Sequence, residues 1–567
     1  MSFSSWRRKT YTLLTQSVLQ RDPYLALALV IGALLVFNGI WWGWSDCCWH
    51  PDQMALRGLG GFGSHFLEPG EFLKPPFHTY LNFFLSVLPV KLAERAASIV
   101  TGSAHDFTPI AVWWSRLIQL GIFLGVICLS YRIVRRFSSV AAARSVGMIT
   151  ATSAGIVLQA HFLTADIPVT FWMLASFYCA QSILYMGRTR DYVLAGLLAG
   201  VATATKYNGL AIGLAIPIFH LFATKSVPLY RTAFDRRLIA GVAVVVVGFV
   251  IANPYAVLDF PRFSADFIYN YVTTPVYGGN DPEATGYGTF LLAIPEILGW
   301  PMAVVTALGV GWGIFRLRQA SIGERGTVLA ALGVSALYFW KFGSAPRVEV
   351  RFVLPIVPLM LFAGASLWST ALHRQYRLAV AALAALIAYN IVASYWVGRR
   401  FIEDPRMAAL HWVSANVRAG SAMESSTYTP SWKYYAGISV ASIRMPTVSG
   451  RNRLFSRMFA GDEQMRRAAE QHNTDAGLDW YSAPALAARS PEFIAIDSLY
   501  FDRFLGGDGA ADYPGVYSYF NDLLSGRLGY RIVYDRSSDE WPRWLYPGEI
   551  KVLENRMVIL RRASGTG

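Results

Sequence analysis

The chain has 567 residues, of which 54% are hydrophobic, 14% aromatic and only 15% charged, and its mean hydropathy is +0.36. A typical soluble domain carries about 25% charged residues, so this composition excludes an ordinary soluble protein and an intrinsically disordered one. The four cysteines are too few to staple a secreted disulfide scaffold of this length.

The net charge of +14 is unevenly distributed. Before about Val397 there are 29 Lys and Arg against 17 Asp and Glu, and after it 21 against 19. The basic excess therefore belongs to the apolar part, where Lys and Arg mark the cytoplasmic ends of membrane helices. A nucleic-acid-binding protein would instead show a basic face on a soluble domain, so we expect no nucleic acid partner.

Eleven apolar runs are candidates for membrane spans, which need roughly 17–25 residues each. They lie at 24–44, 110–131, 143–160, 167–187, 192–205, 208–224, 238–252, 289–315, 327–340, 352–371 and 378–396. Runs rich in small residues, such as 143–160 and 192–205, must pack against neighbouring helices or line a cavity. The sequence thus predicts a multi-pass α-helical membrane protein with about 11 spans, in contact with membrane lipids.

Basic residues fix the expected orientation, because they favour the cytoplasmic side. One side of the predicted bundle collects Arg7, Arg8, Lys9, Arg21, Arg132, Arg135, Arg136, Arg144, Arg188, Arg190, Lys225, Arg231, Arg236, Arg237, Arg316, Arg318, Arg325, Arg374 and Arg377. We therefore expect an inner-membrane protein with a cytoplasmic N-terminus. The first span is followed by Trp41, Trp42 and Trp44, which favours an uncleaved anchor over a signal peptide.

The last 170 residues change character. Short β-branched runs at Glu492–Asp497, Tyr530–Tyr534 and Met557–Arg561 predict strands, and Pro405–Arg418 predicts a helix. We expect a transmembrane module over 1–396, with a long outer loop at 45–109, and an extracytoplasmic mixed α/β domain over 397–567.

Five ionisable residues fall at the same outer level of the predicted topology. They are Asp52, Lys74, Asp166, Lys206 and Arg351. Charges at membrane depth are costly, so their placement indicates function. Cations can hold a phosphate and stabilise the charge that develops on it as it leaves, and a carboxylate can accept the proton of an attacking group. The set therefore suits a reaction on a phosphate-linked lipid.

Plainer roles stay open for the same residues. The three cations could extend to lipid headgroups, and the two acids could cap helices, since Asp166 stands just before Ile167-Pro168. His50, His65, His78 and His161 are candidate metal ligands, but without a tight repeat spacing we favour structural or interfacial roles for them.

Several motifs in this order resemble the GT-C membrane glycosyltransferases, in particular the protein O-mannosyltransferase and aminoarabinose-transferase branch. They are His50-Pro51-Asp52, Lys74-Pro75-Pro76, HFLTADIP at 161–168, ATKYNG at 204–209, NPYAVLDFPR at 253–262 and RFVLP at 351–355. The resemblance extends over roughly residues 20–396. The tail, with its 491–497 strand and 500–503 segment, also resembles that of bacterial members.

The resemblance implies transfer of a sugar from a polyprenyl-phosphate donor to an extracytoplasmic acceptor, with Asp52 as the catalytic base. Asp166 matches a second acidic position, which orients groups or helps bind a metal. Lys74 and Lys206 match contacts to the carrier phosphate, and Arg351 a basic residue before a late span. Gln53 stands where members often have Glu, which weakens a metal site beside Asp52. A divalent metal cofactor stays open, with Asp166 and His161 as candidate ligands.

A single displacement would invert the anomeric centre, whereas a covalent intermediate would retain it. A transporter or flippase of lipid-linked sugars is the alternative, with Asp52 and Asp166 as proton-relay acids, although no internal repeat is evident. A structural scaffold would leave the five charges unexplained. The sugar and the acceptor stay open.

Overall fold

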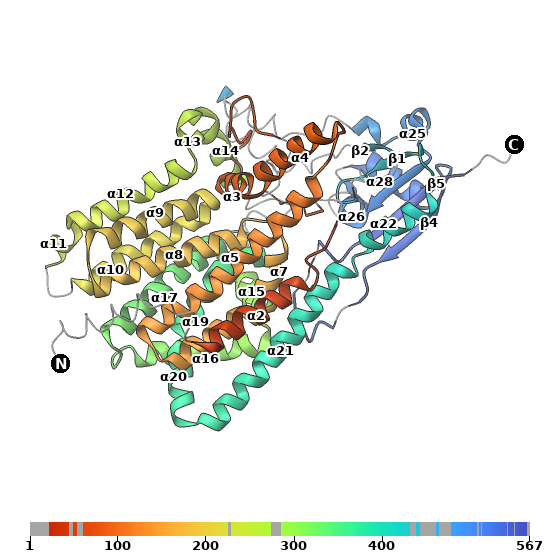
Figure 1. The fold of residues 1–567 in the computed structure, drawn as a ribbon. Helices are drawn as coiled ribbons and strands as arrows, with labels where there is room; N and C mark the ends of the chain where they lie inside the picture. Colours follow the sequence, from red (N-terminus) through yellow and green to blue (C-terminus); the bar gives the residue numbers. More distant parts are fainter. Residues whose placement is uncertain are drawn as a thin grey trace.

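In the computed structural model the apolar runs fold into a bundle of helices, and a mixed sheet packs at one end of it (Figure 1). The structure describes residues 22–44, 49, 50, 52, 53, 61–224, 228–273, 285–430, 432, 438–442, 461–463, 478–506, 510, 511, 513–540, 542–548, 550 and 552–563. Arg7, Arg8, Lys9, Arg21 and Lys225, used above for orientation, lie outside the described residues.

The helices of the bundle follow one another with short connections. The first are α2 (Pro23–Phe37), α3 (Phe77–Asn82), η3 (Phe83–Val87), α4 (Leu88–Thr101), α5 (Thr108–Phe137), α6 (Val140–Thr152), α7 (Ala154–His161), α8 (Asp166–Tyr185) and α9 (Thr189–Thr205). Next come η4 (Tyr207–Leu214), α10 (Ala215–Ala223), α11 (Leu229–Ala233), α12 (Arg236–Ala252), α13 (Tyr255–Leu258) and α14 (Phe260–Thr273). The last are α15 (Tyr287–Leu298), α16 (Trp300–Arg316), α17 (Ile322–Gly343), α18 (Val350–Val353), η6 (Leu354–Ile356), α19 (Val357–Ala363), α20 (Ala365–Arg374) and α21 (Tyr376–Ile402).

Every predicted apolar run coincides with a helix or a helix pair, but the count of about 11 spans is not confirmed. Five stretches of the described chain are long and apolar enough to cross a membrane, or seven if two bent helix pairs each count as one span. The shorter apolar helices include α2 and the η4–α10 segment. A helix below about 17 residues does not cross the hydrocarbon core alone, which is why length cannot settle the number.

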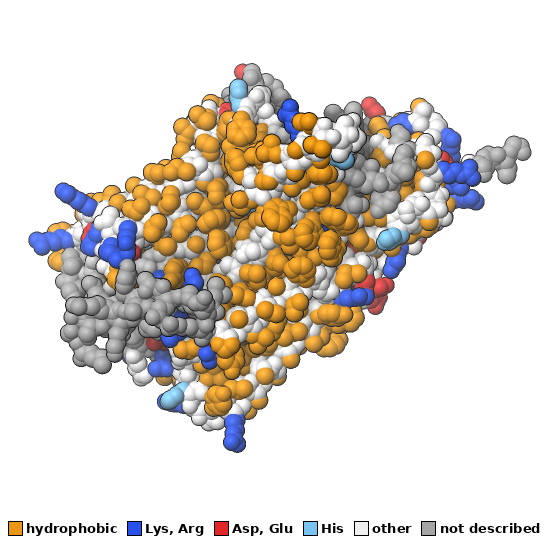
Figure 2. Space-filling model, viewed as in Figure 1, with side chains coloured by type: hydrophobic (Ala, Val, Ile, Leu, Met, Phe, Trp, Pro, Cys, Tyr) orange, Lys and Arg blue, Asp and Glu red, His pale blue; other side chains and the backbone are white. Residues whose placement is uncertain are grey.

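The bundle exposes apolar side chains where a soluble protein would expose polar ones. Leu34 of α2, Val246 of α12 and Phe315 of α16 are 64%, 64% and 74% exposed. Figure 2 shows hydrophobic side chains across the middle of the helical part, with Lys and Arg gathered toward its ends. An apolar surface of this extent is stable only against lipid, so the fold is that of a membrane protein.

Two predicted spans end or bend where glycine permits it. The run 24–44 is helical only to Phe37, because Gly39 takes a φ of +105° and lies so close to Gly398 that a Cβ would be 2.6 Å from its carbonyl oxygen. The run 289–315 is two helices, α15 and α16, that meet at 113° around Gly299, whose φ is +78°.

The C-terminal residues form a five-stranded sheet of order β2-β1-β3-β5-β4. Its strands are β1 (Ala422–Ser425), β2 (Ser439–Ser442), β3 (Phe493–Asp497), β4 (Tyr530–Ser537) and β5 (Arg556–Arg562). β1 runs parallel to β2 and β3, whereas β5 is antiparallel to β3 and β4. The sheet is accompanied by α22 (Pro405–Asn416), η7 (Leu478–Trp480), α25 (Ala483–Arg489), α26 (Ser498–Leu505) and α28 (Pro514–Leu524). The three predicted strands and the predicted helix are therefore confirmed; the division at 397 stays a prediction.

One hydrophobic cluster is shared by the sheet and the adjoining end of the helical bundle. Trp42 and Phe162 of the bundle pack in the same cluster as Met423 and Ile559 of the sheet. At its centre Arg406 of α22 is fully buried with Asp404, whose Oδ2 lies 2.6 Å from Nη2 of Arg406. The indole Nε1 of Trp42 donates to the same carboxylate at 2.8 Å. The chain just before the first outer loop is thereby fixed to the C-terminal part.

We expect Arg406→Met to lower the free energy of unfolding by about 3–5 kcal/mol, because it leaves the Asp404 carboxylate buried without its cation. Arg561→Met is the matched control, since Arg561 is 48% exposed and pairs with Glu492 at 3.1 Å on the surface. It should cost less than about 1 kcal/mol. Thermal unfolding of both variants in detergent measures the difference; an equal shift would contradict the proposed weight of the buried pair.

Candidate functional site

The first outer loop places Asp52 between two cations that are far apart in sequence. One carboxylate oxygen contacts the ammonium of Lys74 and the other contacts Nη1 of Arg351. Lys74 lies just before α3, and Arg351 lies in α18 at the start of a late apolar segment. The three residues that the sequence places at one membrane level are therefore in direct contact.

His50 shapes the turn that carries Asp52. Its Nδ1 accepts a hydrogen bond from the backbone N–H of Asp52 at 3.0 Å, and its ring packs 4.5 Å from that of Phe162, centroid to centroid. Burial, with Arg351 adding to it, lowers the pKa of His50 to about 3. The imidazole is thus neutral at physiological pH and acts as an acceptor that positions the loop.

Electrostatics keep Asp52 ionised. Burial raises its pKa, but the neighbouring charges of Arg351 and Lys74 outweigh burial and hold the pKa of Asp52 well below its usual range. Its carboxylate is consequently a weak proton acceptor while both cations contact it.

A second ion pair stands at the ends of two adjacent helices. Asp166 is the first residue of α8 and is 3% exposed, and Lys206 follows the last residue of α9; Nζ of Lys206 lies 2.6 Å from Oδ1 of Asp166. An acid at a helix N-terminus and a cation at a helix C-terminus are each favoured by the helix dipole. The helix-end role that the sequence left open for Asp166 is therefore compatible with its ion pair.

The aromatic ring of Phe352 links the two ion-pair groups. Nζ of Lys206 lies 5.0 Å from the centroid of this ring, and Cζ of Arg351 lies 5.8 Å from it. The structure thus brings all five predicted site residues into one region around a single ring.

The sequence reasoning missed two further members of the region. Glu349 contacts Nη2 of Arg347 with one carboxylate oxygen and Nε of Arg351 with the other. Glu349 has an extended backbone, with φ −106° and ψ 144°, which brings side chains two residues apart to the same side. The alternation Arg-Val-Glu-Val-Arg at 347–351 was the available signal.

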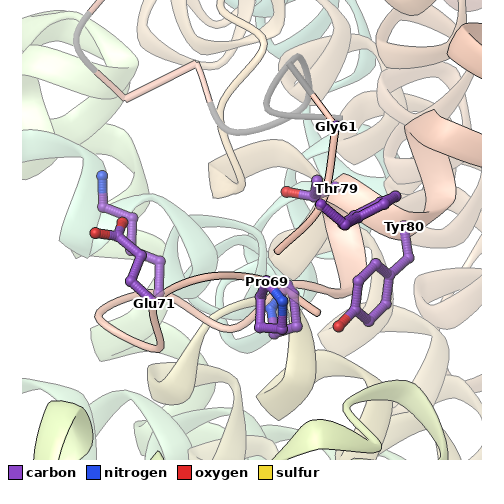
Figure 3. A pocket seen from close by; sticks show the side chains of 8 residues that line it. Gly61, Pro69, Glu71, Thr79 and Tyr80 are labelled. Carbon is purple, nitrogen blue, oxygen red and sulfur yellow. The ribbon is translucent and has the colours of Figure 1, made fainter. Parts of the chain in front are cut away.

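A hollow of about 310 Å³, part of it open to solvent, adjoins this cluster (Figure 3). It is lined by Gly61, Phe62, Pro69, Glu71, Lys74, Pro76, Thr79 and Tyr80. Because Lys74 forms part of its wall and contacts Asp52, the hollow lies next to the charged groups. Aromatic, carboxylate and hydroxyl side chains together suit a polar ligand with an apolar face.

The donor set fits a metal ion poorly. Asp52 and Asp166 each contact a cationic side chain, whose charge would repel a dication. Both ring nitrogens of His161 face backbone carbonyl oxygens, those of Val157 at 2.8 Å and Asn38 at 2.9 Å, and its ring stacks on Phe401. Within the described residues no three His, Cys, Asp or Glu side chains converge as a metal site. We therefore route no step through a metal.

Comparison with known proteins agrees with the motifs. Residues 107–255, which include Asp166 and Lys206, match the dolichyl-phosphate-mannose-protein mannosyltransferase family. No curated protein sequence matches the chain.

Two solved structures cover nearly the whole chain. ArnT from Cupriavidus metallidurans, solved with bound undecaprenyl phosphate, has a TM-score of 0.53 at 14% identity, covering 94% of this chain and 97% of ArnT. The archaeal oligosaccharyltransferase AglB from Archaeoglobus fulgidus, solved with an inhibitory peptide and a dolichol-phosphate, has a TM-score of 0.47 at 13% identity, covering 91% of this chain and 73% of AglB. The similarity to ArnT confirms at the level of the fold the resemblance to the GT-C membrane glycosyltransferases that the sequence motifs indicate.

Proposed function

We propose that this protein transfers a sugar from a polyprenyl-phosphate carrier to an acceptor hydroxyl at the outer face of the membrane. The observation that carries the proposal is the Asp52 carboxylate in contact with both Lys74 and Arg351. A base and a cationic phosphate cradle in contact are the two functions that such a transfer needs. The fold shared with ArnT, which was solved with undecaprenyl phosphate, supports a lipid-phosphate donor.

The donor phosphate would exchange places with carboxylates on the cations. Lys74 and Arg351 would bind its oxygens, since charge-assisted hydrogen bonds to phosphate are strong and Arg can bind two oxygens at once. Lys206 would add a third cation from the other side of Phe352. The hollow beside Lys74 would receive the part of the substrate next to the phosphate.

The reaction then needs one base and no strong general acid. The acceptor oxygen attacks the anomeric carbon from the face opposite the phosphate, and its proton passes to Asp52. The bond between the anomeric carbon and the phosphate oxygen breaks, and its electron pair leaves with the polyprenyl phosphate, which gains one negative charge. This single displacement inverts the anomeric centre. Asp166 would keep Lys206 in place.

We expect Asp52→Asn to lower the rate of transfer about 10²–10⁴-fold, which is the usual contribution of a general base. Carrier binding should persist, because the amide no longer competes for the two cations. Lys74→Ala should weaken carrier binding about 10–100-fold, as the loss of one charge-assisted contact does. Both are measured in proteoliposomes with a panel of labelled polyprenyl-phosphate sugars, including mannose, aminoarabinose and galactosamine donors.

Asp522→Asn is the control for that experiment, because Asp522 pairs with the exposed Arg527 far along the chain. Near-normal turnover of Asp52→Asn would contradict its role as base. Absence of transfer from every donor, together with movement of labelled lipid between leaflets, would favour a flippase.

The pH dependence should report the exchange of ligands around Asp52. Donor phosphate on Lys74 and Arg351 offsets the charges that hold its pKa low, so the pKa of Asp52 should rise on binding. Because a base must be deprotonated, activity falls as pH drops through this pKa. The acidic limb of kcat, which reports the complex, should therefore lie at higher pH than that of kcat/KM, which reports the free enzyme.

Lys74→Ala serves as the comparison for the pH profiles. Removing one of the two cations should shift the acidic limb of kcat/KM to higher pH in the free enzyme. Acidic limbs that coincide for kcat and kcat/KM, with no shift in the variant, would show that Asp52 is not the titrating base.

A further inference from the structure

Glu349 occupies a position that the proposed reaction does not explain. Its two carboxylate oxygens contact different arginines, Arg347 and Arg351, so the side chain is fully engaged although 27% exposed. Arg351 in turn contacts Asp52 through its Nη1. The guanidinium of Arg351 is thus held between two carboxylates.

Phosphate and carboxylate compete for the same donors of an arginine. Nε of Arg351 contacts Glu349, and its Nη1 contacts Asp52. A phosphate that binds through two oxygens needs a pair of adjacent donors on one edge of the guanidinium. It can gain them only if at least one of the two carboxylates moves away.

The charges of the region bear on which phosphate binds more tightly. Among the contacting residues described above, Lys74, Lys206, Arg347 and Arg351 supply four positive charges, against three negative charges from Asp52, Asp166 and Glu349. The donor phosphodiester carries one negative charge, whereas a phosphate monoester such as the released carrier carries about 1.5–2 at neutral pH. A cationic cradle therefore favours product over donor, and product release becomes the difficult step.

We propose that Glu349 competes with the carrier phosphate for Arg351 and Arg347 and thereby promotes release of the polyprenyl phosphate product. The inference rests on the proposed function and adds a role for a residue outside the base and the phosphate contacts. Glu349 moves aside when phosphate binds and returns to the two arginines when it leaves. Asp52 cannot supply the same effect during turnover, because it has just accepted the proton of the acceptor.

A purely structural role makes a different prediction. If Glu349 only held the extended segment before α18 in place, its loss would misplace Arg351 and weaken binding of the phosphate. Competition predicts the opposite sign, because a neutral side chain leaves both arginines to the phosphate. The sign of the change in affinity therefore separates the two roles.

The test uses a short-chain polyprenyl monophosphate and the full-length protein in detergent micelles. We expect Glu349→Gln to lower the Kd of this lipid at least tenfold, which corresponds to about 1.4 kcal/mol. Its dissociation rate and kcat should fall, and product inhibition of transfer should strengthen. Glu349→Asp, which shortens the side chain and withdraws it from one arginine, should give a smaller tightening in the same direction.

Glu492→Gln is the control, because Glu492 pairs with the exposed Arg561 on the sheet. It should leave the Kd unchanged. An unchanged or higher Kd in both Glu349 variants, in a protein whose wild type binds the lipid and transfers sugar, would overturn this inference alone. A wild type that neither binds the lipid nor transfers sugar would overturn the proposed function, and this inference with it.

Discussion

The geometry of the site depends on one constraint: the Asp52 carboxylate sits at membrane level and must be compensated by cations that come from elsewhere in the chain. Lys74 is 22 residues away and Arg351 is 299 residues away. Contact with both ties the first outer loop to the start of a late helical segment. An uncompensated carboxylate at this depth would be costly, so the cations hold the loop as firmly as the loop holds them. The rest of the region follows from that closure, since Glu349 and Phe352 flank Arg351 in sequence.

The same loop is also fixed from its other side. Trp42 donates to Asp404, and Arg406 lies over the rings of Trp42 and Trp49, with its Cζ 5.4 Å and 5.3 Å from their centroids. Trp49 directly precedes His50, so the turn that carries Asp52 starts from residues packed against the C-terminal part. The sheet is thereby coupled to the site through three successive contacts. This coupling gives the C-terminal part a positional role whatever it binds.

The sequence predicted the level of the five charged residues but could not predict how they pair. Positive-inside bias and loop order place Asp52, Lys74 and Arg351 on one side, because these depend on local composition alone. Pairing depends on how helices separated by hundreds of residues pack. The bend between α15 and α16 was missed because Gly299 reads as one more small residue in an apolar run, and only its φ of +78° marks a break. Glu349 was visible in the sequence, but nothing there distinguishes an acid that neutralises an arginine from one that competes with a ligand.

A site that alternates between carboxylates and phosphate solves a problem set by the membrane. Cations kept without partners at this depth would pay a large desolvation cost, and they would move when the lipid left. Carboxylates hold Lys74, Arg351 and Lys206 in place between turnovers, so that the cradle is preorganised when a phosphate arrives. The consequence is that every binding event must displace an acid, which weakens affinity for donor and product alike. Because the product carries more charge, an acid that stays ionised throughout the reaction, as Glu349 does in this scheme, acts mainly against the product. Moderate affinity for the carrier is then a property of the charge arrangement.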